Sequence, residues 1–513
     1  MKHNVEQSVS LWMATAKASS PPALTSDTRA DVCVVGAGIA GLTTAYLLAR
    51  EGKFVIVLDD GPIAGGQSQR TTAHLSNAID DRYIEIEKVH GEEGARLAAE
   101  SHSAAIDKIE SIASSEGIDC DFSRLDGYLF VPPGESTDIL NNERDAARRA
   151  GLTDVEIVPR APLTPFNTGP SLRFPRQGQF HPLKYFERLG QAIEKRGGRI
   201  HSGTHVSSIE GGKPARVSTK NGPTVTADAV VVATNTPIND MLAIHTKQAP
   251  YVTYAIGAAV PTGSVERALY WDTLESYHYI RLQAGADGKD VLIVGGEDHK
   301  TGQADDQKER WQRLETWARE RFPMITAIDY RWSGMVMETT DGLAFIGRNP
   351  GDKDNVFIAT GDSGMGMTNG TIAGILLNDL IQGRENRWSE IYDPSRKPVW
   401  GMAWKEYLSE NANVAKRYVQ DWLGSGDVAS EKEIPRGSGA ILREGLTKVA
   451  VFHDEQGQYH RCSAVCPHLG CIVQWNGGEK TWDCPCHGSR FDSKGGIING
   501  PANVPLSKAE KQA

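Results

Sequence analysis

The 513-residue sequence has no apolar run long enough to cross a membrane and no tract of basic residues. A membrane-spanning helix needs about 20 consecutive, mainly apolar residues, so we expect no transmembrane segment. Lysine and arginine number 55 against 65 aspartate and glutamate residues, which leaves a formal charge of −10. Because nucleic-acid binding needs clustered positive charge, we expect no nucleic-acid partner.

The first 29 residues lack the charged segment, the apolar stretch and the twin arginine of a secretory leader. On this ground we expect the protein in the cytoplasm. Cysteine is scarce outside one region: Cys33 and Cys120 stand alone, and the other five lie between residues 462 and 486. Clustered cysteines with histidines nearby indicate a metal centre before a disulfide framework in a cytoplasmic protein.

Composition and apolar periodicity divide the chain into four parts. Residues 1–29 are rich in alanine, serine and proline, and we expect an arm that runs over the surface. A long α/β region follows over 30–423, and its last segment has the spacing of an amphipathic helix. Glycine, serine and charged residues then predict a linker over 424–433. The remaining residues, 434–513, show the alternation typical of β-strands and contain the cysteine cluster.

A glycine-rich turn lies between a predicted strand and a predicted helix. Gly36 permits a tight turn, Gly38 lets the backbone approach a pyrophosphate, and Gly41 lets the helix pack closely on the strand. Phosphates then lie at the helix N-terminus, where free N–H groups favour negative charge. Asp59 ends the next strand, where a carboxylate can accept hydrogen bonds from ribose hydroxyls. The pattern predicts a dinucleotide site.

The stretch DVCVVGAGIAGLTTAYLLAREGKFVIVLDDGPIAGGQSQRTTAHLS (31–76) resembles the N-terminal signature of the D-amino-acid-oxidase and glycine-oxidase superfamily of FAD oxidoreductases. Later segments match as well: the turn at Val206, the strand end at Ala233, and the closing motif of 341–347 with 359–368. The resemblance covers roughly residues 30–385. No second GxGxxG occurs in a strand–helix–strand setting, which argues against a separate NAD(P)H domain.

The resemblance implies an α/β FAD-binding domain that is Rossmann-like, of the glutathione-reductase type, interleaved with an α+β substrate domain. It assigns about 30–80, 180–240 and 335–385 to FAD binding, and about 81–179 and 241–334 to the substrate domain. The FAD-binding residues that it implies are Gly36, Gly38, Ile39, Ala40, Gly41, Asp59, Asp60, Gly66, Gln67, Ser68, Arg70, Thr71, Thr72, Val206, Ala233, Thr234, Gly347, Gly361, Gly364, Met365, Gly366, Met367 and Thr368.

A second cofactor motif lies near the C-terminus. Cys466 and His468 form a C-x-H pair, and Cys484 and His487 form a C-x-x-H pair. Two thiolates for one iron and two imidazoles for the other are the ligands of a Rieske 2Fe–2S centre. Zinc is the competing interpretation, although zinc fingers pair C-x-x-C with H-x₃₋₅-H.

The flanking residues favour the iron–sulfur interpretation. CPHLGCIVQWN, CPCHGSRFD and GPANVPL resemble Rieske domains over nearly all of 434–506. The resemblance implies an all-β domain that binds a 2Fe–2S cluster through Cys466, His468, Cys484 and His487. It also implies a disulfide between Cys471 and Cys486.

These two cofactors predict an FAD-dependent oxidoreductase. In the family that the chain resembles, substrates are amines and amino acids, oxidised at the carbon next to nitrogen. We therefore expect a small-molecule amine or amino acid as substrate. We expect a cytochrome, a quinone or a small electron carrier as the one-electron partner. Two alternatives stay open: reversed flow from the cluster to FAD for a reductive or monooxygenase reaction, and a non-catalytic electron-transfer or redox-sensing protein.

Three residues of the predicted substrate region are candidates for catalysis. Arg281 could hold a substrate carboxylate in a bidentate pair, or it could form a surface ion pair. Tyr279 belongs to an aromatic group that could equally be sheet core. His181 could act as an acid or base, with a structural histidine as the alternative.

Overall fold

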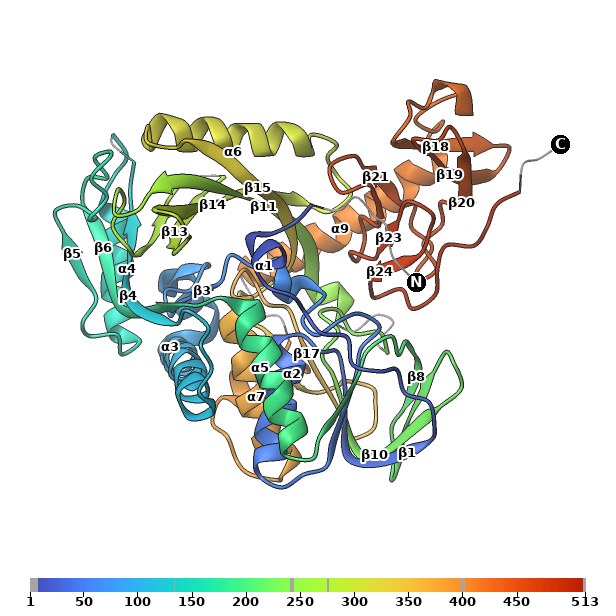
Figure 1. Cartoon of the computed structure of the whole chain (residues 1–513), viewed down its shortest axis with the longest axis horizontal. Helices are drawn as coiled ribbons and strands as arrows, with labels where there is room; N and C mark the ends of the chain where they lie inside the picture. Colours follow the sequence, from blue (N-terminus) through green and yellow to red (C-terminus); the bar gives the residue numbers. More distant parts are fainter. Residues whose placement is uncertain (1–7, 133, 240–243, 275, 398–401, 511–513) are drawn as a thin grey trace.

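The structure is a computed structural model, and it describes residues 8–132, 134–239, 244–274, 276–397 and 402–510. In the helix 402–423 the described side chains are those of 408–414, 416 and 420–422. Two large sheets of the N-terminal region meet two small sheets of the C-terminal region (Figure 1).

The first large sheet has eight strands, and its centre is parallel. In pairing order the strands are β16 (Phe345–Arg348), β17 (Val356–Thr360), β10 (Thr224–Val232), β1 (Thr28–Val35), β2 (Val55–Leu58) and β7 (Arg199–His201), with β9 (Ala215–Thr219) beside β10 and β8 (Val206–Glu210) beside β9. Every residue of β2 and of β17 is buried, as expected for apolar strands of a parallel sheet covered by other elements.

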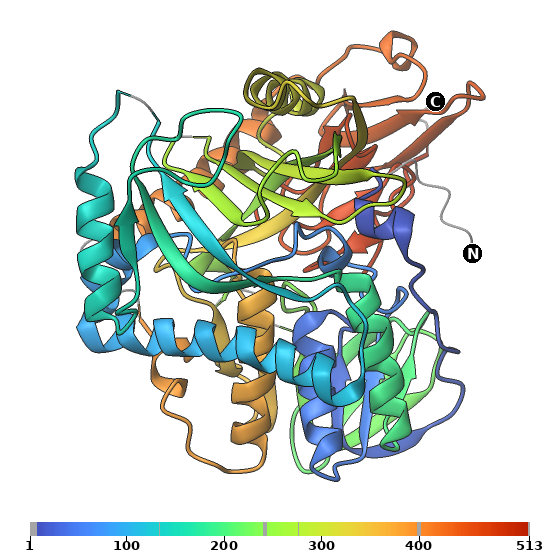
Figure 2. The same cartoon turned by 60° about the vertical axis from the view of Figure 1, so that its left-hand side comes forward.

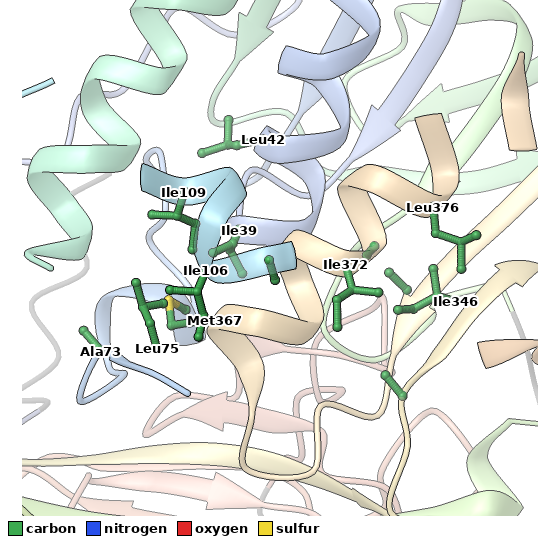
Figure 3. Close-up of a cluster of buried hydrophobic side chains, with 14 of the residues drawn as sticks. Ile39, Leu42, Ala73, Leu75, Ile106, Ile109, Ile346, Met367, Ile372 and Leu376 are labelled. Atoms are coloured by element: carbon green, nitrogen blue, oxygen red, sulfur yellow. The ribbon is translucent and has the colours of Figure 1, made fainter. Parts of the chain in front are cut away.

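Helices α2 (Ile39–Arg50), α5 (Pro182–Lys195) and α7 (Gly366–Ile381) pack together beside this sheet. The long helix α3 (Arg82–Glu116) lies crosswise to them (Figure 2). Apolar side chains of α2, α3 and α7 converge in one buried cluster (Figure 3). Glycine lets α7 approach α2 closely, because a Cβ at Gly370 would lie 2.4 Å from Cγ2 of Ile39.

The second large sheet has nine strands and is mainly antiparallel. Its strands, in pairing order, are β15 (Ala327–Thr339), β11 (Gln248–Pro261), β14 (Lys289–Lys300), β13 (His278–Gln283), β12 (Leu269–Asp272), β4 (Ser123–Phe130), β6 (Ser171–Gln179) and β3 (His74–Leu75), with β5 (Glu156–Val158) beside β6. Helix α6 (Gln307–Arg321) packs on β14 and β11, and helix α4 (Asp138–Arg149) packs on α3.

The C-terminal region is built from short antiparallel strands. One sheet contains β18 (Ser438–Glu444), β19 (Thr447–His453) and β20 (Tyr459–Ser463), and the other contains β21 (Gln474–Asn476), β22 (Thr481–Asp483), β23 (Arg490–Asp492) and β24 (Ile497–Asn499). Helix α9 (Met402–Leu423) leads into it from the N-terminal region. The shorter helices are α1 (Leu11–Thr15), α8 (Ser389–Tyr392) and the 3₁₀ turns η1 (Gln67–Gln69), η2 (His245–Lys247) and η3 (Glu431–Glu433).

The sequence led us to expect that the segment before β1 runs over the surface. In the structure, part of this segment is also buried against the rest of the fold. Trp12, in α1, is fully buried, and its indole Nε1 donates a hydrogen bond to the Thr71 carbonyl at 2.6 Å. The Trp12 ring also packs edge-on to His181. A large apolar side chain buries itself where the folded chain offers a partner, and here the partner is the loop after β2.

No helix in the described part of the chain combines the length and the apolar character that a bilayer span requires.

Candidate functional site

The glycine-rich turn joins β1 to α2 and leaves no room for side chains. A Cβ at Gly36 would lie 2.3 Å from the Ala233 carbonyl oxygen, and the backbone there has a φ of +109°. A Cβ at Gly41 would lie 1.9 Å from the Gly36 carbonyl oxygen. Both positions therefore require glycine, the first for the turn and the second for helix–strand packing.

Two adjacent carboxylates follow β2. The Asp59 carboxylate accepts hydrogen bonds from the backbone N–H groups of Ala37 (2.6 Å) and Gly61 (2.7 Å). Burial and the neighbouring Asp60 raise the pKa of Asp59 to about 7. Asp60 pairs with Nδ1 of His205 at 3.2 Å. Asp59 thus holds the turn in place from the position where the sequence predicts a ribose-binding acid.

A large cavity, about 1280 Å³, runs from this turn to the second sheet. It is lined by all of the predicted FAD-binding residues except Gly41, Gly347 and Thr368. Those three have packing roles: a Cβ at Gly347 would lie 2.8 Å from Pro394, and Thr368 bonds to Nδ1 of His102 at 2.9 Å. The tertiary fold therefore brings the predicted FAD-binding residues, which come from separate segments of the sequence, to one cavity.

The loop before α7, residues 361–365, forms part of the cavity wall. Gly361 and Gly364 have φ values of +72° and +70°, which favour glycine. A Cβ at Gly364 would lie 2.5 Å from Oδ2 of Asp80. The N-terminus of α7 faces the cavity through Gly366 and Met367. A helix N-terminus stabilises negative charge on a bound group.

Of the three catalytic candidates, only Tyr279 lines the cavity. Arg281 is fully buried, and its guanidinium donates to the carbonyls of Thr72, Ala73 and Phe180 and to Gln283. Arg281 is thus buried beside the cavity wall, where it forms neither a surface ion pair nor part of the cavity lining. His181 caps α5 through Nδ1 and bonds to Thr15 through Nε2, as a structural histidine does.

An acidic end of the cavity is the feature that we did not foresee from the sequence. We define it by Asp80, Asp81, Tyr277 and Asp298, which all line the cavity beside Tyr279. The Tyr277 hydroxyl lies 3.2 Å from Oδ2 of Asp80 and 3.5 Å from Oδ2 of Asp298. Asp80 and Asp81 are adjacent in the sequence, but no sequence pattern indicates that they lie close to Asp298 in the folded protein.

The second candidate site contains the four predicted cluster ligands. Cys466 and Cys484 are both 1% exposed. The Cys484 thiol and the backbone N–H groups of His468 and Leu469 lower the pKa of Cys466 to about 7, which favours a thiolate. The imidazole rings of His468 and His487 lie 5.0 Å apart between centroids.

The two imidazoles offer free ligand atoms. Both ring nitrogens of His468 and Nδ1 of His487 are buried and have no hydrogen-bond partner among the described residues. Buried polar atoms are normally paired, so unpaired ones indicate a missing ligand. Two thiols beside two such imidazoles fit the donor set of a Rieske cluster.

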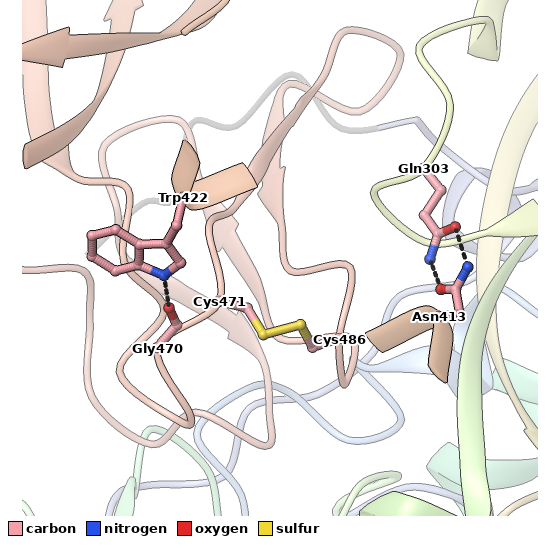
Figure 4. The surroundings of a disulfide bond; sticks show 6 residues. All are labelled: Gln303, Asn413, Trp422, Gly470, Cys471 and Cys486. Atoms are coloured by element: carbon pink, nitrogen blue, oxygen red, sulfur yellow. Dashed lines mark hydrogen bonds between the residues drawn. A yellow bond between two sulfur atoms is a disulfide. The ribbon is translucent and has the colours of Figure 1, made fainter. Parts of the chain in front are cut away.

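A disulfide between Cys471 and Cys486 joins the two loops that contain these ligands, as predicted (Figure 4). Near it, the Trp422 indole of α9 donates to the Gly470 carbonyl at 3.1 Å. Asn413 of α9 and Gln303 form an amide pair, with 2.7 Å from Nε2 of Gln303 to Oδ1 of Asn413. Helix α9 therefore contacts the cluster loop on one side and the N-terminal region on the other.

The two candidate sites share a wall. The C-terminal segment after β23 lines the large cavity through Gly496, Ile497, Ile498, Asn499, Gly500, Ala502, Asn503 and Pro505. The Asn503 carbonyl also accepts a hydrogen bond from Nε2 of His205 at 2.8 Å. The cysteine-rich part is thus seated against the dinucleotide cavity.

A buried ion pair holds the same junction. Glu479, whose side chain is 2% exposed, lies 3.5 Å from Nη1 of Arg70 in the loop after β2. Hydroxyls of Ser8 and Ser333 donate to its Oε1. Burial would raise the pKa of Glu479, but Arg70, Arg490 and these hydroxyls lower it overall.

Comparison with known proteins identifies both halves. Residues 31–380 match the family model of FAD dependent oxidoreductases, and residues 425–510 match the Rieske [2Fe-2S] domain. The first match spans more than half of the chain. The chain therefore belongs to the FAD-dependent oxidoreductase family, carries a C-terminal Rieske domain, and binds FAD and a 2Fe–2S cluster.

Individual relatives agree with this assignment. YhfW of Bacillus subtilis (strain 168), named for a Rieske 2Fe-2S iron-sulfur centre, is 31% identical over 499 residues, 97% of each chain. Gamma-glutamylputrescine oxidoreductase of Escherichia coli (strain K12) is 29% identical over 411 residues, 77% of this chain and 94% of that protein. Glycine oxidase from Geobacillus kaustophilus shares the fold, with a TM-score of 0.59 at 19% identity, covering 72% of this chain and 99% of that one. The predicted family and fold class are confirmed.

Proposed function

We propose that this enzyme dehydrogenates the C–N bond of an amine or amino acid and passes the electrons through the Rieske cluster to an external one-electron acceptor. The acceptor would be a cytochrome, a quinone or a small electron carrier. Similarity to proteins named for gamma-glutamylputrescine and for glycine oxidation supports an amine or amino acid as substrate. When bound, FAD supplies two-electron hydride chemistry and the cluster moves single electrons.

The observation that carries this proposal is the thin wall between the two sites. Gly488, next to the cluster ligand His487, approaches Met335 so closely that a Cβ there would lie 3.1 Å from its Sδ. Met335 itself lines the FAD cavity, and its backbone N–H donates to Oε1 of Gln67 at 2.8 Å. One side chain therefore separates the cluster loop from the FAD cavity, which supports electron passage between them.

The chain's own residues contribute positioning and charge. The turn at Gly36 and the N-terminus of α2 would hold the pyrophosphate, and the N-terminus of α7 would face the flavin ring. Oxidation removes a hydride from the carbon beside nitrogen and, from an ammonium substrate, one proton from the nitrogen, so the product is an iminium with a single positive charge. Carboxylates of the acidic end, such as Asp298, stand where they can stabilise that charge.

The test is anaerobic mixing of the purified holoenzyme with a panel of amines and amino acids. We expect the flavin absorbance to bleach with a substrate, followed by reduction of the cluster band. A Cys484→Ser variant, which removes a cluster ligand, should keep the flavin bleaching and lose reduction of an external acceptor. This variant separates substrate oxidation from electron export.

Two other outcomes would overturn the proposal. Bleaching of the flavin only by an external reduced carrier, through the cluster, would establish the reversed flow. Absence of bleaching with every amine, amino acid and carrier would leave a redox-sensing role.

A further inference from the structure

The acidic end of the cavity has more carboxylate than its neighbours can satisfy. The single hydroxyl hydrogen of Tyr277 faces Oδ2 of both Asp80 and Asp298 and can serve only one of them. Oδ1 of Asp298 is buried and has no hydrogen-bond partner among the described residues. An unsatisfied buried carboxylate oxygen in a ligand cavity indicates that a donor arrives with the ligand.

Aromatic rings surround the same end. Tyr277 and Tyr279 have centroids 5.7 Å apart, and His74 packs edge-on to Tyr279 at 5.7 Å. Trp271 adds a further ring 6.1 Å from His74, and all four residues line the cavity. Electron-rich ring faces attract cations, so carboxylates among aromatic rings make a site for a positive group.

At the acidic end, the three carboxylates of Asp80, Asp81 and Asp298 outnumber Arg82, the one cationic side chain of the described residues that lines the cavity there. Among the described lining residues, Arg70 pairs with Glu479 at the domain junction, and Arg82 lies by Asp80 and Asp81. Lys220 lies beside His205, near the glycine-rich turn. Arg281 donates to backbone carbonyls and does not line the cavity. A substrate carboxylate placed at the acidic end would therefore meet an excess of like charge.

We infer that the substrate presents a cationic ammonium group to this acidic end, where the Asp298 carboxylate binds it with Asp80, among the rings of Tyr277 and Tyr279. The substrate class is then an alkylammonium ion whose bound portion has no carboxylate. This inference rests on the proposed function, whose substrate it narrows, but it concerns binding and is tested without turnover.

The experiment compares two probes of the same shape and opposite charge, tert-butylammonium and pivalate. Neither has a hydrogen on the carbon that bears its charged group, so no dehydrogenation can occur. Each is titrated into the oxidised holoenzyme while the flavin absorption spectrum is recorded. We expect a saturable spectral change with tert-butylammonium and none with pivalate.

Variants test which carboxylates bind the cationic probe. Asp298→Asn removes one charge with little change of shape and should weaken tert-butylammonium binding at least tenfold. Asp80→Asn, a second variant in case the first does not fold, should weaken it severalfold. Asp329→Asn is the matched control, because Asp329 is an exposed carboxylate of β15 outside the cavity. It should bind the probe as the unmodified enzyme does.

Saturable binding of pivalate in preference to tert-butylammonium would overturn the inference, as would unchanged affinity in both Asp298→Asn and Asp80→Asn. These failures are distinct from failure of the proposed function. If no amine bleaches the flavin but tert-butylammonium binds through Asp298, the cation site stands and the proposed reaction falls. If amines do bleach the flavin and pivalate is the better ligand, only the cation inference falls.

Discussion

Two carboxylates, a buried one at the domain junction and a half-buried one in the cavity, have opposite environments. Glu479 has an arginine partner and receives hydroxyl hydrogen bonds from Ser8 and Ser333, and its pKa is lowered overall. Asp298 lies among other carboxylates, and burial raises its pKa to about 7. The same chemical group is thus satisfied by the protein in one place and left for a ligand in the other.

The difference distinguishes structural charge from functional charge. At the junction, Glu479 and Arg70 balance each other's charge, which seats the Rieske domain on the FAD cavity. In the acidic end, burial raises the pKa of Asp298 and the nearby charge of Asp80 adds to this shift. Such a cluster costs stability, and it persists in active sites because it binds or stabilises a charged group.

Breaking the junction should have the largest effect. Glu479→Ala leaves Arg70 buried without its carboxylate and should lower the free energy of unfolding by about 3–5 kcal/mol. The thermal unfolding midpoint of the holoenzyme measures this. Glu455→Ala is the control, because Glu455 is more than half exposed in its pair with Lys480 and should cost no more than about 1 kcal/mol. Equal shifts for the two variants would show that the junction contributes no special stability.

Neutralising Asp298, the carboxylate in the cavity, should raise the free energy of unfolding, whereas breaking the junction lowers it. Folded Asp298 has a pKa of about 7, against 3.8 for the ordinary group, so the folded state holds a proton that the unfolded state has lost. Stability therefore falls as pH rises from about 4 to about 7. Asp298→Asn removes this loss and should stabilise the protein at pH 8 by on the order of 1–4 kcal/mol, with little effect at pH 4.

Unfolding midpoints at pH 4 and pH 8 check this prediction. Glu479→Gln makes the same carboxylate-to-amide change at the junction and should destabilise the protein at pH 8. If both amide variants shift stability in the same direction at pH 8, the contrast between the two regions is wrong.

The smallest predicted effect concerns the pH dependence of probe binding. Asp80 and Glu338 disfavour the charge on Asp298, while Thr253, Tyr277 and Arg310 favour it. Because only the ionised carboxylate attracts a cation strongly, tert-butylammonium should bind more tightly as pH rises through about 7. Tyr277→Phe removes a hydroxyl donor, worth about 0.5–1.5 kcal/mol, and should move this transition upward by up to about one pH unit. An unchanged or lower transition would exclude Tyr277 as a donor to Asp298.

Both cofactor sites were accessible from the sequence because their chemistry is local. Gly36, Gly38 and Gly41 serve one turn, and backbone space dictates two of them. The Rieske ligands lie in two short motifs, and the disulfide joins the same two loops. Short-range spacing of this kind survives in the sequence because few residues have to meet.

The sequence could not show in the same way which of the catalytic candidates line the cavity. Arg281 and His181 have suitable chemistry, but the guanidinium of Arg281 is taken up by the backbone carbonyls of Thr72 and Ala73, in a loop that packs over it. His181 is held by the start of α5. Tyr279 and Arg281 are two residues apart in β13 and therefore face the same side of the strand, so strand periodicity could not separate them. Tertiary packing does separate them, because the loop at Thr72 and Ala73 covers Arg281 and leaves Tyr279 at the cavity.

By itself, the sequence determined that this protein binds FAD and a Rieske cluster, since each motif contains its own ligands or turn. Only the tertiary structure decided how the two cofactor sites share a wall and that one end of the cavity is acidic. Tyr277 and Asp298 lie at the ends of the paired strands β13 and β14, whereas Asp80 precedes Tyr277 by 197 residues. The three meet because the fold brings the loop after β3 against the ends of β13 and β14. Electrostatic character of a cavity is a sum over such long-range neighbours, which no local pattern contains.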